Sequence, residues 1–262
     1  MTGKCPVLFV SHGSPMFAIE PGQAGPALQR WADEQASSAL IKGIVIMSPH
    51  WMTRGGVAVM SNAQPATWHD FGGFPDALYQ LQYPAVGDLA LSATVQDLLG
   101  QAGIAHGADA RRPFDHGAWV PLMHLYPQAN VPVVQLSLPA GYSPAEIYAV
   151  GQALAPLREQ GILLVGSGSM THNLYELDRS EGPTEPYVTA FCGWVHDTLM
   201  QGDLAAMLDY RARAPHAARA HPTDEHFLTI YFALGAAAWG QPGGSTPRYI
   251  TRDVQFRSIS MD

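Results

Sequence analysis

The chain has 262 residues, of which 47% are apolar and 10% aromatic, so it can bury a substantial hydrophobic core. Its net charge is −8 and it has no basic cluster, which argues against nucleic acid and anionic membranes as partners. Charged residues make up only 14%, below the roughly 25% of an average globular protein. A surface this poor in charge is compatible with a homo-oligomer.

The cysteines and the apolar runs restrict the protein class further. Cys5 and Cys192 form no CxxC pair, which argues against a disulfide framework and a cysteine-based zinc site, and we expect Cys5 to be buried in the first strand. The N-terminus enters a strand almost at once, without the charged and apolar regions of a signal peptide. No apolar run approaches the ~18 residues of a transmembrane helix. We therefore expect a cytoplasmic protein.

Predicted strands and helices alternate along the first half of the chain. Apolar runs predict strands, and a period of 3.6 residues predicts helices. The predicted elements are a strand at 7–10, a helix at 25–35, strands at 44–50 and 57–60, an irregular segment at 63–83, and helices at 89–99 and 120–125.

The second half continues the alternation. Ser143 as N-cap and Pro144 at the first position begin a helix that Gly161 closes. Thr223 is expected to cap a last long helix. The other predicted elements are strands at 131–138, 162–165, 248–251 and 254–259, and helices at 186–199 and 204–210.

This order of elements predicts an α/β fold. Strands separated by helices favour a mostly parallel central sheet with helices on both faces. There is no internal repeat and no linker, so we expect a single domain over residues 1–262.

Three histidines each follow a predicted buried strand, and they are His12, His50 and His172. Small or turn-forming residues separate each from its strand. In an open α/β sheet, ligands bind just beyond the carboxyl ends of the strands. Three imidazoles delivered to that edge predict a metal site, although each could also have a structural role. Imidazole ligands suit zinc, iron, copper or nickel.

Other histidines are candidates through their local setting. His226 lies in the first turn of the last helix, beside Glu225. His116 and His69 each have an aspartate neighbour, and a neighbour or a backbone carbonyl could orient either as an acid–base group. The remaining histidines are interpreted as surface or packing residues, and they are His106, His124, His196, His216 and His221.

Several motifs together resemble a known family over most of the chain. They are Ser11-His12-Gly13-Ser14-Pro15-Met16, Ser48-Pro49-His50-Trp51, His69-Asp70-Phe71-Gly72-Gly73-Phe74-Pro75, Phe114-Asp115-His116-Gly117-Ala118-Trp119, Val134-Gln135-Leu136-Ser137, Thr171-His172-Asn173-Leu174 and Glu225-His226. The ordered set resembles the DODA-type class III extradiol ring-opening dioxygenases, the bacterial DOPA 4,5-dioxygenase-like group.

The resemblance implies roles for five of the histidines. His12, His50 and His226 would be metal ligands, and His172 would be either a fourth ligand or an acid–base group. His116 would be a histidine on the substrate side. Neighbouring helical residues diverge by roughly 100°, so Glu225 and His226 are not expected to bind the same ion. We choose His226 as the metal ligand and keep Glu225 as a candidate for a residue that contacts and orients a ligand.

The implied activity is cleavage of a catechol ring with O2 to a semialdehyde. The divalent metal would be Zn2+ or Fe2+, and zinc itself has no redox chemistry. The base that takes the second hydroxyl proton would be His172 or His116. The aromatic-rich loop from Trp68 to Phe74, together with Trp51 and Trp119, is the candidate for stacking on a flat substrate.

The sequence is also compatible with other functions and with several substrate-binding cations. A zinc hydrolase and a non-catalytic metal-binding protein are the alternative functions. A cation that would pair with a substrate carboxylate is not identified, and the candidates are Arg54, Arg111 and Arg112. The catechol itself is not identified either.

Overall fold

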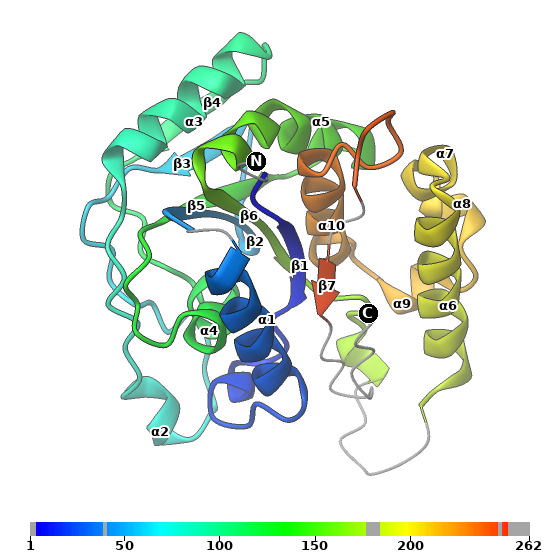
Figure 1. Ribbon diagram of the computed structural model, residues 1–262. Coiled ribbons are helices and arrows are strands. Elements are labelled where there is room, and N and C mark those ends of the chain that lie inside the picture. The colour runs from blue at the N-terminus through cyan, green and yellow to red at the C-terminus, as the bar shows by residue number, and fades with distance from the viewer. Residues whose placement is uncertain (1–3, 39–40, 177–183, 246–247, 251–262) are drawn as a thin grey trace.

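The computed structural model describes residues 4–38, 41–176, 184–245 and 248–250 (Figure 1). Within these ranges one seven-stranded sheet crosses the molecule in the order β4-β3-β5-β2-β6-β1-β7. The strands are β1 (Val7–Ser11), β2 (Gly43–Thr53), β3 (Val57–Met60), β4 (His106–Asp109), β5 (Val133–Pro139), β6 (Ile162–Gly168) and β7 (Arg248–Ile250).

Helices cover both faces of this sheet (Figure 1). The longer ones are α1 (Ala24–Ser38), α3 (Leu89–Gln101), α4 (His116–Leu125), α5 (Pro144–Leu154), α6 (Pro186–Gln201) and α10 (Glu225–Ala236). The shorter ones are η1 (Pro15–Ala18), α2 (Asp76–Tyr79), η2 (Ala155–Gln160), η3 (Leu174–Glu176), α7 (Leu204–Leu208), α8 (Tyr210–Arg213) and α9 (Ala217–Ala220).

The predicted α/β fold with a mostly parallel sheet is confirmed. Strands β5, β2, β6, β1 and β7 pair in parallel, whereas β3 pairs antiparallel with β5. Successive side chains of a strand point to opposite faces. In β1, Val7 and Phe9 pack with α5 and α10, and Leu8 and Val10 pack with α1 and α4. Burial on both faces explains why these strands are continuous apolar runs.

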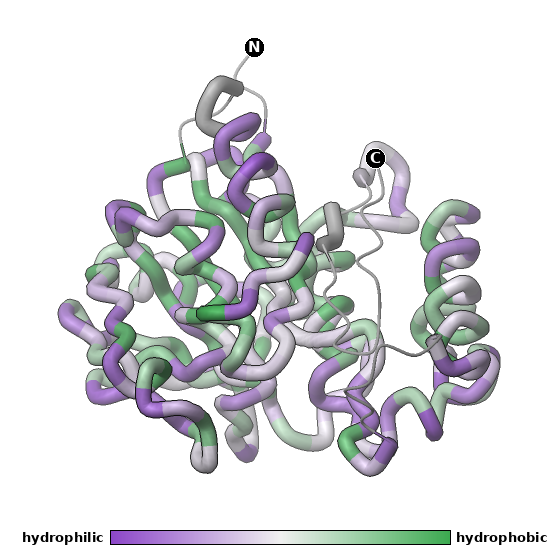
Figure 2. The backbone as a smooth tube through the Cα atoms, turned by 90° about the horizontal axis from the view of Figure 1, so that it is seen from below, coloured by the Kyte–Doolittle hydropathy of each residue, from purple (hydrophilic) through white to green (hydrophobic). Residues whose placement is uncertain are grey.

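The hydropathy of the chain follows the same layering. Hydrophobic segments of the backbone lie in the interior of the molecule, and hydrophilic segments gather on the outer turns (Figure 2). Cys5 is buried, as predicted, but it precedes β1 rather than lying within it. None of the helices in the described ranges is both long enough and apolar enough to span a membrane.

Several elements differ from those predicted. Helix α4 begins at His116 rather than 120, with Asp115 at its N-cap position and without a side-chain cap hydrogen bond. Asp224 rather than Thr223 precedes α10, and the Thr223 hydroxyl donates instead to the Glu225 carboxylate at 3.2 Å. The predicted helix at 204–210 ends as α7 and restarts as α8. Strand β4 was not predicted, because its residues are polar and largely exposed.

The second predicted terminal strand, at 254–259, lies outside the described residues. The first coincides with β7.

Strand β2 does not end at His50 as predicted, because it continues past a break in register. Ser48 pairs with Ser137 of β5, and the next pair is Met52 with Leu138. Pro49, His50 and Trp51 therefore bulge out of the ladder. Pro49 has no N–H to donate to a ladder, and such bulges re-aim a side chain near functional sites.

Candidate functional site

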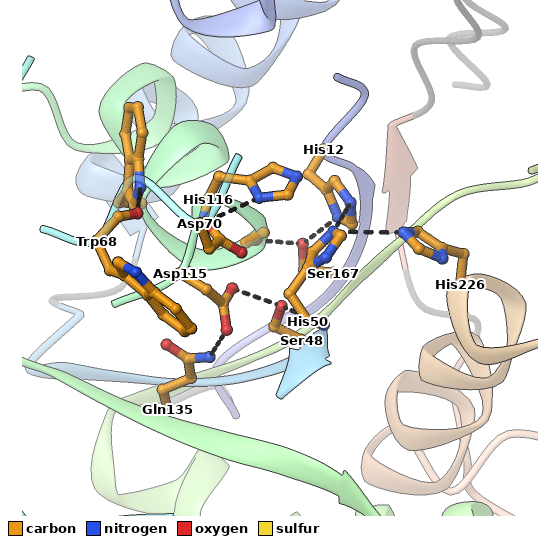
Figure 3. Close-up of polar contacts among 12 residues, drawn as sticks. His12, Ser48, His50, Trp68, Asp70, Asp115, His116, Gln135, Ser167 and His226 are labelled. Carbon is orange, nitrogen blue, oxygen red and sulfur yellow. Dashed lines mark hydrogen bonds and ion pairs between the residues drawn. The ribbon is translucent and has the colours of Figure 1, made fainter. Parts of the chain in front are cut away.

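Three histidines meet where β1, β2 and α10 come together (Figure 3). His12 directly follows β1, His50 lies in the bulge of β2, and His226 lies in the first turn of α10. The His50 Nε2 atom is 3.0 Å from His12 Nε2 and 3.3 Å from His226 Nε2. Because β2, β6 and β1 are neighbours in the sheet, their carboxyl ends lie at one edge.

The position of His226 depends on close contact between α10 and the end of β6. The Ser169 N–H donates to the His226 carbonyl at 2.9 Å. A Cβ added at Gly168 would collide with that same carbonyl and with the Thr229 hydroxyl. Glycine at this position therefore lets the helix approach the strand closely enough to bring His226 to the sheet edge.

Hydrogen bonds define the tautomers of two of these histidines. The Ser167 hydroxyl donates to the Gly117 carbonyl, so it accepts from His12 Nδ1, which lies at 3.0 Å. The Nδ1 atom of His226 is 2.9 Å from the Glu225 carboxylate, which only accepts. Both rings therefore carry their proton on Nδ1 and direct the Nε2 lone pair toward the other histidines.

Burial keeps these rings neutral. His12 and His226 are 1% and 5% exposed. Burial, reinforced by the neighbouring histidines, lowers the pKa of each well below its ordinary value. Burial and then the nearby His116 lower the pKa of His50 to about 3. The neutral imidazole is the form that binds metal ions.

The arrangement fits a metal ion by its donor chemistry. The His50 Nε2 atom lies 3.0 Å from that of His12 and 3.3 Å from that of His226, and nitrogen lone pairs this close repel unless a proton or cation lies between them. A tetrahedral ion with metal–nitrogen distances of about 2.1 Å spaces its ligand atoms by ~3.4 Å. His12, His50 and His226 are also one of three groups of possible ligand residues in the described ranges.

His172 lies beside this group rather than within it. Its ring stacks on that of His226, with centroids 3.5 Å apart and planes at 10°. Its Nδ1 atom is 4.0 Å from the Glu225 oxygen that contacts His226. Of the four predicted ligands, the structure thus brings His12, His50 and His226 within 4.8 Å of one another and places His172 in a second group with Glu225 and His226.

His116 lies on the opposite side, against His50, with ring centroids 3.9 Å apart. Asp70 accepts from the His116 backbone N–H at 2.9 Å and from its Nδ1 at 3.0 Å. Burial raises the pKa of the Asp70 carboxyl, but the hydrogen bonds and charge of His116 outweigh it and leave that pKa below its ordinary value. The His116 tautomer is thereby defined, with Nε2 left to accept a proton.

Neither aspartate orients the histidine that neighbours it in the sequence. Asp70 orients His116, which is 46 residues away, and not its neighbour His69. His69 instead contacts the Leu81 carbonyl at 3.0 Å and holds the irregular segment together. Asp115 does not orient His116, because its carboxylate accepts from Ser48, Arg112 and Gln135.

The three candidate tryptophans differ in their access to a substrate. Trp119 is fully buried and its Nε1 donates to the Trp68 carbonyl, so it is a core residue. Trp51 is 6% exposed and packs on the Arg112 guanidinium. Trp68 is 43% exposed, and Phe71 lies edge-on to His116 with centroids 5.8 Å apart. Only Trp68 and Phe71 remain candidates for stacking.

Sequence reasoning missed the roles of Ser167 and Gln135, and it did not identify Asp70 as the partner of His116. Gln135 lies inside the predicted strand at 131–138, whereas Ser167 lies in β6 beyond the predicted strand at 162–165, and both are fully buried. Buried polar groups require partners, so a polar residue within a predicted buried strand is the signal that would have identified Gln135, and this signal was absent for Ser167.

Comparison with known proteins bears on this site. The family model described as the catalytic LigB subunit of aromatic ring-opening dioxygenase matches residues 6–256. These residues include all the histidines discussed above.

Relatives with known names match over most of their length. The 4,5-DOPA dioxygenase extradiol of Beta vulgaris is 40% identical over 87% of this chain and 85% of its own. The protein of the same name from Escherichia coli K12 is 37% identical over 98% and 93%. A solved structure of an uncharacterized Escherichia coli K12 protein has a TM-score of 0.66 and 30% identity, and covers 82% of each chain.

Proposed function

Because this chain belongs to the family of the catalytic LigB subunit of aromatic ring-opening dioxygenase, and is an extradiol ring-opening dioxygenase, we propose that it cleaves a catechol of the DOPA type at a site built on His12, His50 and His226. The observation that carries the proposal is the convergence of three neutral imidazoles on one point. The likeness to named DOPA dioxygenases supports a substrate of that class.

The proposed ligands are the Nε2 atoms of His12, His50 and His226. Bound there, a divalent metal would acidify a catechol hydroxyl and hold it beside dioxygen. We propose Fe2+ as the active metal, because zinc cannot take part in electron transfer to dioxygen. A zinc hydrolase or a non-catalytic metal protein gains no support from the relatives.

We propose that His116 and His172 move protons on opposite sides of the ligand group. The Asp70 carboxylate would stabilise a protonated His116 while it takes the second hydroxyl proton. His172 is assigned an acid–base role rather than a ligand role, because it falls outside the group formed by His12, His50 and His226, and its ring stacks on that of His226. It is also more exposed than His12 or His226.

The test is oxygen uptake by protein loaded anaerobically with one equivalent of Fe2+ or Zn2+. L-DOPA and a small catechol panel are the substrates, with absorbance recorded for a yellow semialdehyde. We expect uptake with iron alone and none in His12→Ala. Absence of uptake with either metal, despite one equivalent bound, would contradict the proposal.

A second variant separates the two roles of His172. We expect His172→Gln to retain one equivalent of metal and to lose most of kcat. Loss of the metal instead would make His172 a fourth ligand.

A further inference from the structure

Below the proposed ligands lies a buried polar network that no proposed step uses. It consists of Ser48, Asp115 and Gln135, which Figure 3 shows, together with Arg112. Ser48, Asp115 and Gln135 are fully buried, and the Arg112 side chain is 11% exposed. A buried ion pair needs excellent geometry to offset the loss of hydration, and it is weak evidence for stability. Such a network therefore suggests a structural task that an apolar cluster would not perform.

Asp115 is the centre of this network. Its Oδ1 atom accepts from the Ser48 hydroxyl at 2.7 Å, and its Oδ2 atom accepts from Arg112 Nη2 at 2.6 Å and from the Gln135 amide. Gln135 lies on β5 and Ser48 on β2, so one carboxylate joins two strands to the start of α4.

The network meets the bulge of β2 on both sides of His50. The His50 N–H donates to the Ser48 hydroxyl at 3.3 Å, and its carbonyl accepts from Arg112 Nη2 at 3.3 Å. The Arg112 guanidinium also lies over the Trp51 ring, 4.7 Å from its centroid. Pro49, His50 and Trp51 have no register partners in the ladder with β5. The network supplies the restraints that the ladder does not.

We propose that the Arg112–Asp115 pair is a positioning device that holds the β2 bulge, and with it His50, in the ligand geometry. Arg112 is therefore not the cation that pairs with a substrate carboxylate. Its charge already faces Asp115, and its guanidinium is enclosed between Trp51 and Trp68. The inference rests on the proposed role of His50 as a ligand.

The test uses three variants: Arg112→Met, Asp115→Asn and the double variant that combines these two changes. Each is compared with the control variant Arg213→Met. Arg213 forms an exposed pair with Asp209 and is the matched control. Metal affinity is measured by chelator competition, and ligand geometry by the visible spectrum of the Co2+-loaded protein. We expect each single variant to bind metal about 10- to 100-fold more weakly, as for residues that orient ligands elsewhere. The control is expected to match wild type.

The double variant separates positioning from stability, because it removes both buried charges. We expect its melting temperature to recover toward wild type while its metal affinity and Co2+ spectrum remain altered. Ser48→Ala, a milder change, is expected to shift the spectrum in the same direction without unfolding the protein. Unaltered affinity and spectrum in a folded Arg112→Met protein would overturn the proposal.

Steady-state kinetics separates this role from substrate recognition. We expect Arg112→Met to lower kcat, with KM changed equally for 4-methylcatechol and for L-DOPA, which carries a carboxylate. A rise in KM confined to L-DOPA would overturn the proposal and make Arg112 a substrate contact. If wild type cleaves no catechol, the proposed function fails, and the affinity and Co2+ measurements still decide whether the pair positions His50.

Discussion

At the residue scale, the site depends as much on the group that contacts the Nδ1 atom of each imidazole as on the imidazoles themselves. Ser167, Glu225 and Asp70 each contact the Nδ1 atom of one histidine. Each contact selects a tautomer and an orientation, which a histidine alone does not have. Small substitutions of these partners should therefore show which histidines are needed for metal binding and which for proton transfer.

The Ser167 hydroxyl is expected to support metal binding through His12. In Ser167→Ala the His12 Nδ1–H loses its acceptor, so the tautomer with Nε2 free is no longer favoured. We expect metal affinity to fall about 10- to 100-fold in a chelator competition. Ser143→Ala is the control, because it removes a helix cap of about 1 kcal/mol whose hydrogen bonds join Ser143 to Glu146. Wild-type affinity in Ser167→Ala would show that this hydrogen bond is unimportant.

Asp70 is expected to support proton transfer through His116. Asp70→Asn keeps the shape of the side chain and removes the negative charge that would stabilise a protonated His116. We expect kcat to fall about 10- to 100-fold, less than the loss of a general base itself, while metal content stays at one equivalent. Steady-state kinetics on the iron-loaded protein checks this, with Asp88→Asn as control. An unchanged kcat would remove His116 from the proposed mechanism.

At the element scale, two local irregularities bring the histidines together. The bulge in β2 turns His50 out of the ladder, and the glycine at the end of β6 admits the first turn of α10. Neither feature is part of an ideal α/β layer. Both lie at the carboxyl edge of the parallel strands, where such sheets place their ligands.

Gly168→Ala tests the second irregularity. The added methyl group would collide with the His226 carbonyl, so α10 must move away from β6. We expect the free energy of unfolding to fall by about 1–3 kcal/mol, as for other overpacked sites. Metal affinity should fall with it, because His226 moves.

Gly193→Ala in α6 is the control for this substitution, because a Cβ there meets nothing within 4 Å. Replacing an exposed helical glycine by alanine is expected to stabilise the protein by up to about 1 kcal/mol. Denaturant unfolding measures both variants. Equal stability of the two would show that α10 does not need this close approach.

At the scale of the whole molecule, the fold holds several buried neutral histidines in one region. Burial lowers the pKa of His12, His50, His226 and His221 below the ordinary value of 6.5, and to about 3 for His50 and His221. His221 lies in the aromatic core, between Phe191 and Phe227. Below pH 6.5, these histidines therefore bind protons in the unfolded chain, whereas in the folded protein they stay neutral to lower pH.

The stability of the metal-free protein is therefore expected to fall on acidification. Between pH 6.5 and about 3 the unfolded chain binds protons at these histidines that the folded protein does not, so unfolding becomes easier as pH falls. Each histidine adds a slope of up to about 1.4 kcal/mol per pH unit. Urea unfolding at several pH values in the presence of a chelator measures it.

His221→Gln isolates one of these contributions. It removes one titrating group from the core, so the dependence of the unfolding free energy on pH should become less steep. His106→Gln, at an exposed position, is the control and should leave the slope unchanged. An unaltered slope in His221→Gln would mean that this histidine takes up its proton in the folded state.

The α/β class, most strands and helices, and the positions of His12 and His172 after buried strands could be predicted from the amino-acid sequence. These properties follow from short-range patterns: the continuous apolar runs of buried strands, the 3.6-residue period of helices, and turn-forming residues after apolar runs. The N-cap at Ser143 is of the same kind, and the structure confirms it, with Glu146 completing a capping box.

Which groups face one another depends on tertiary packing. Asp70 meets His116 across 46 residues, and Ser167 meets His12 across 155. The approach of His50 Nε2 to within 3.0 Å of His12 Nε2 and 3.3 Å of His226 Nε2 depends on the β2 bulge and on the close packing of α10 against β6. Such contacts depend on strand register and on packing between distant elements, and periodicity carries no information about either. The sequence predicted which side chains reach the sheet edge, and packing determined how they are paired there.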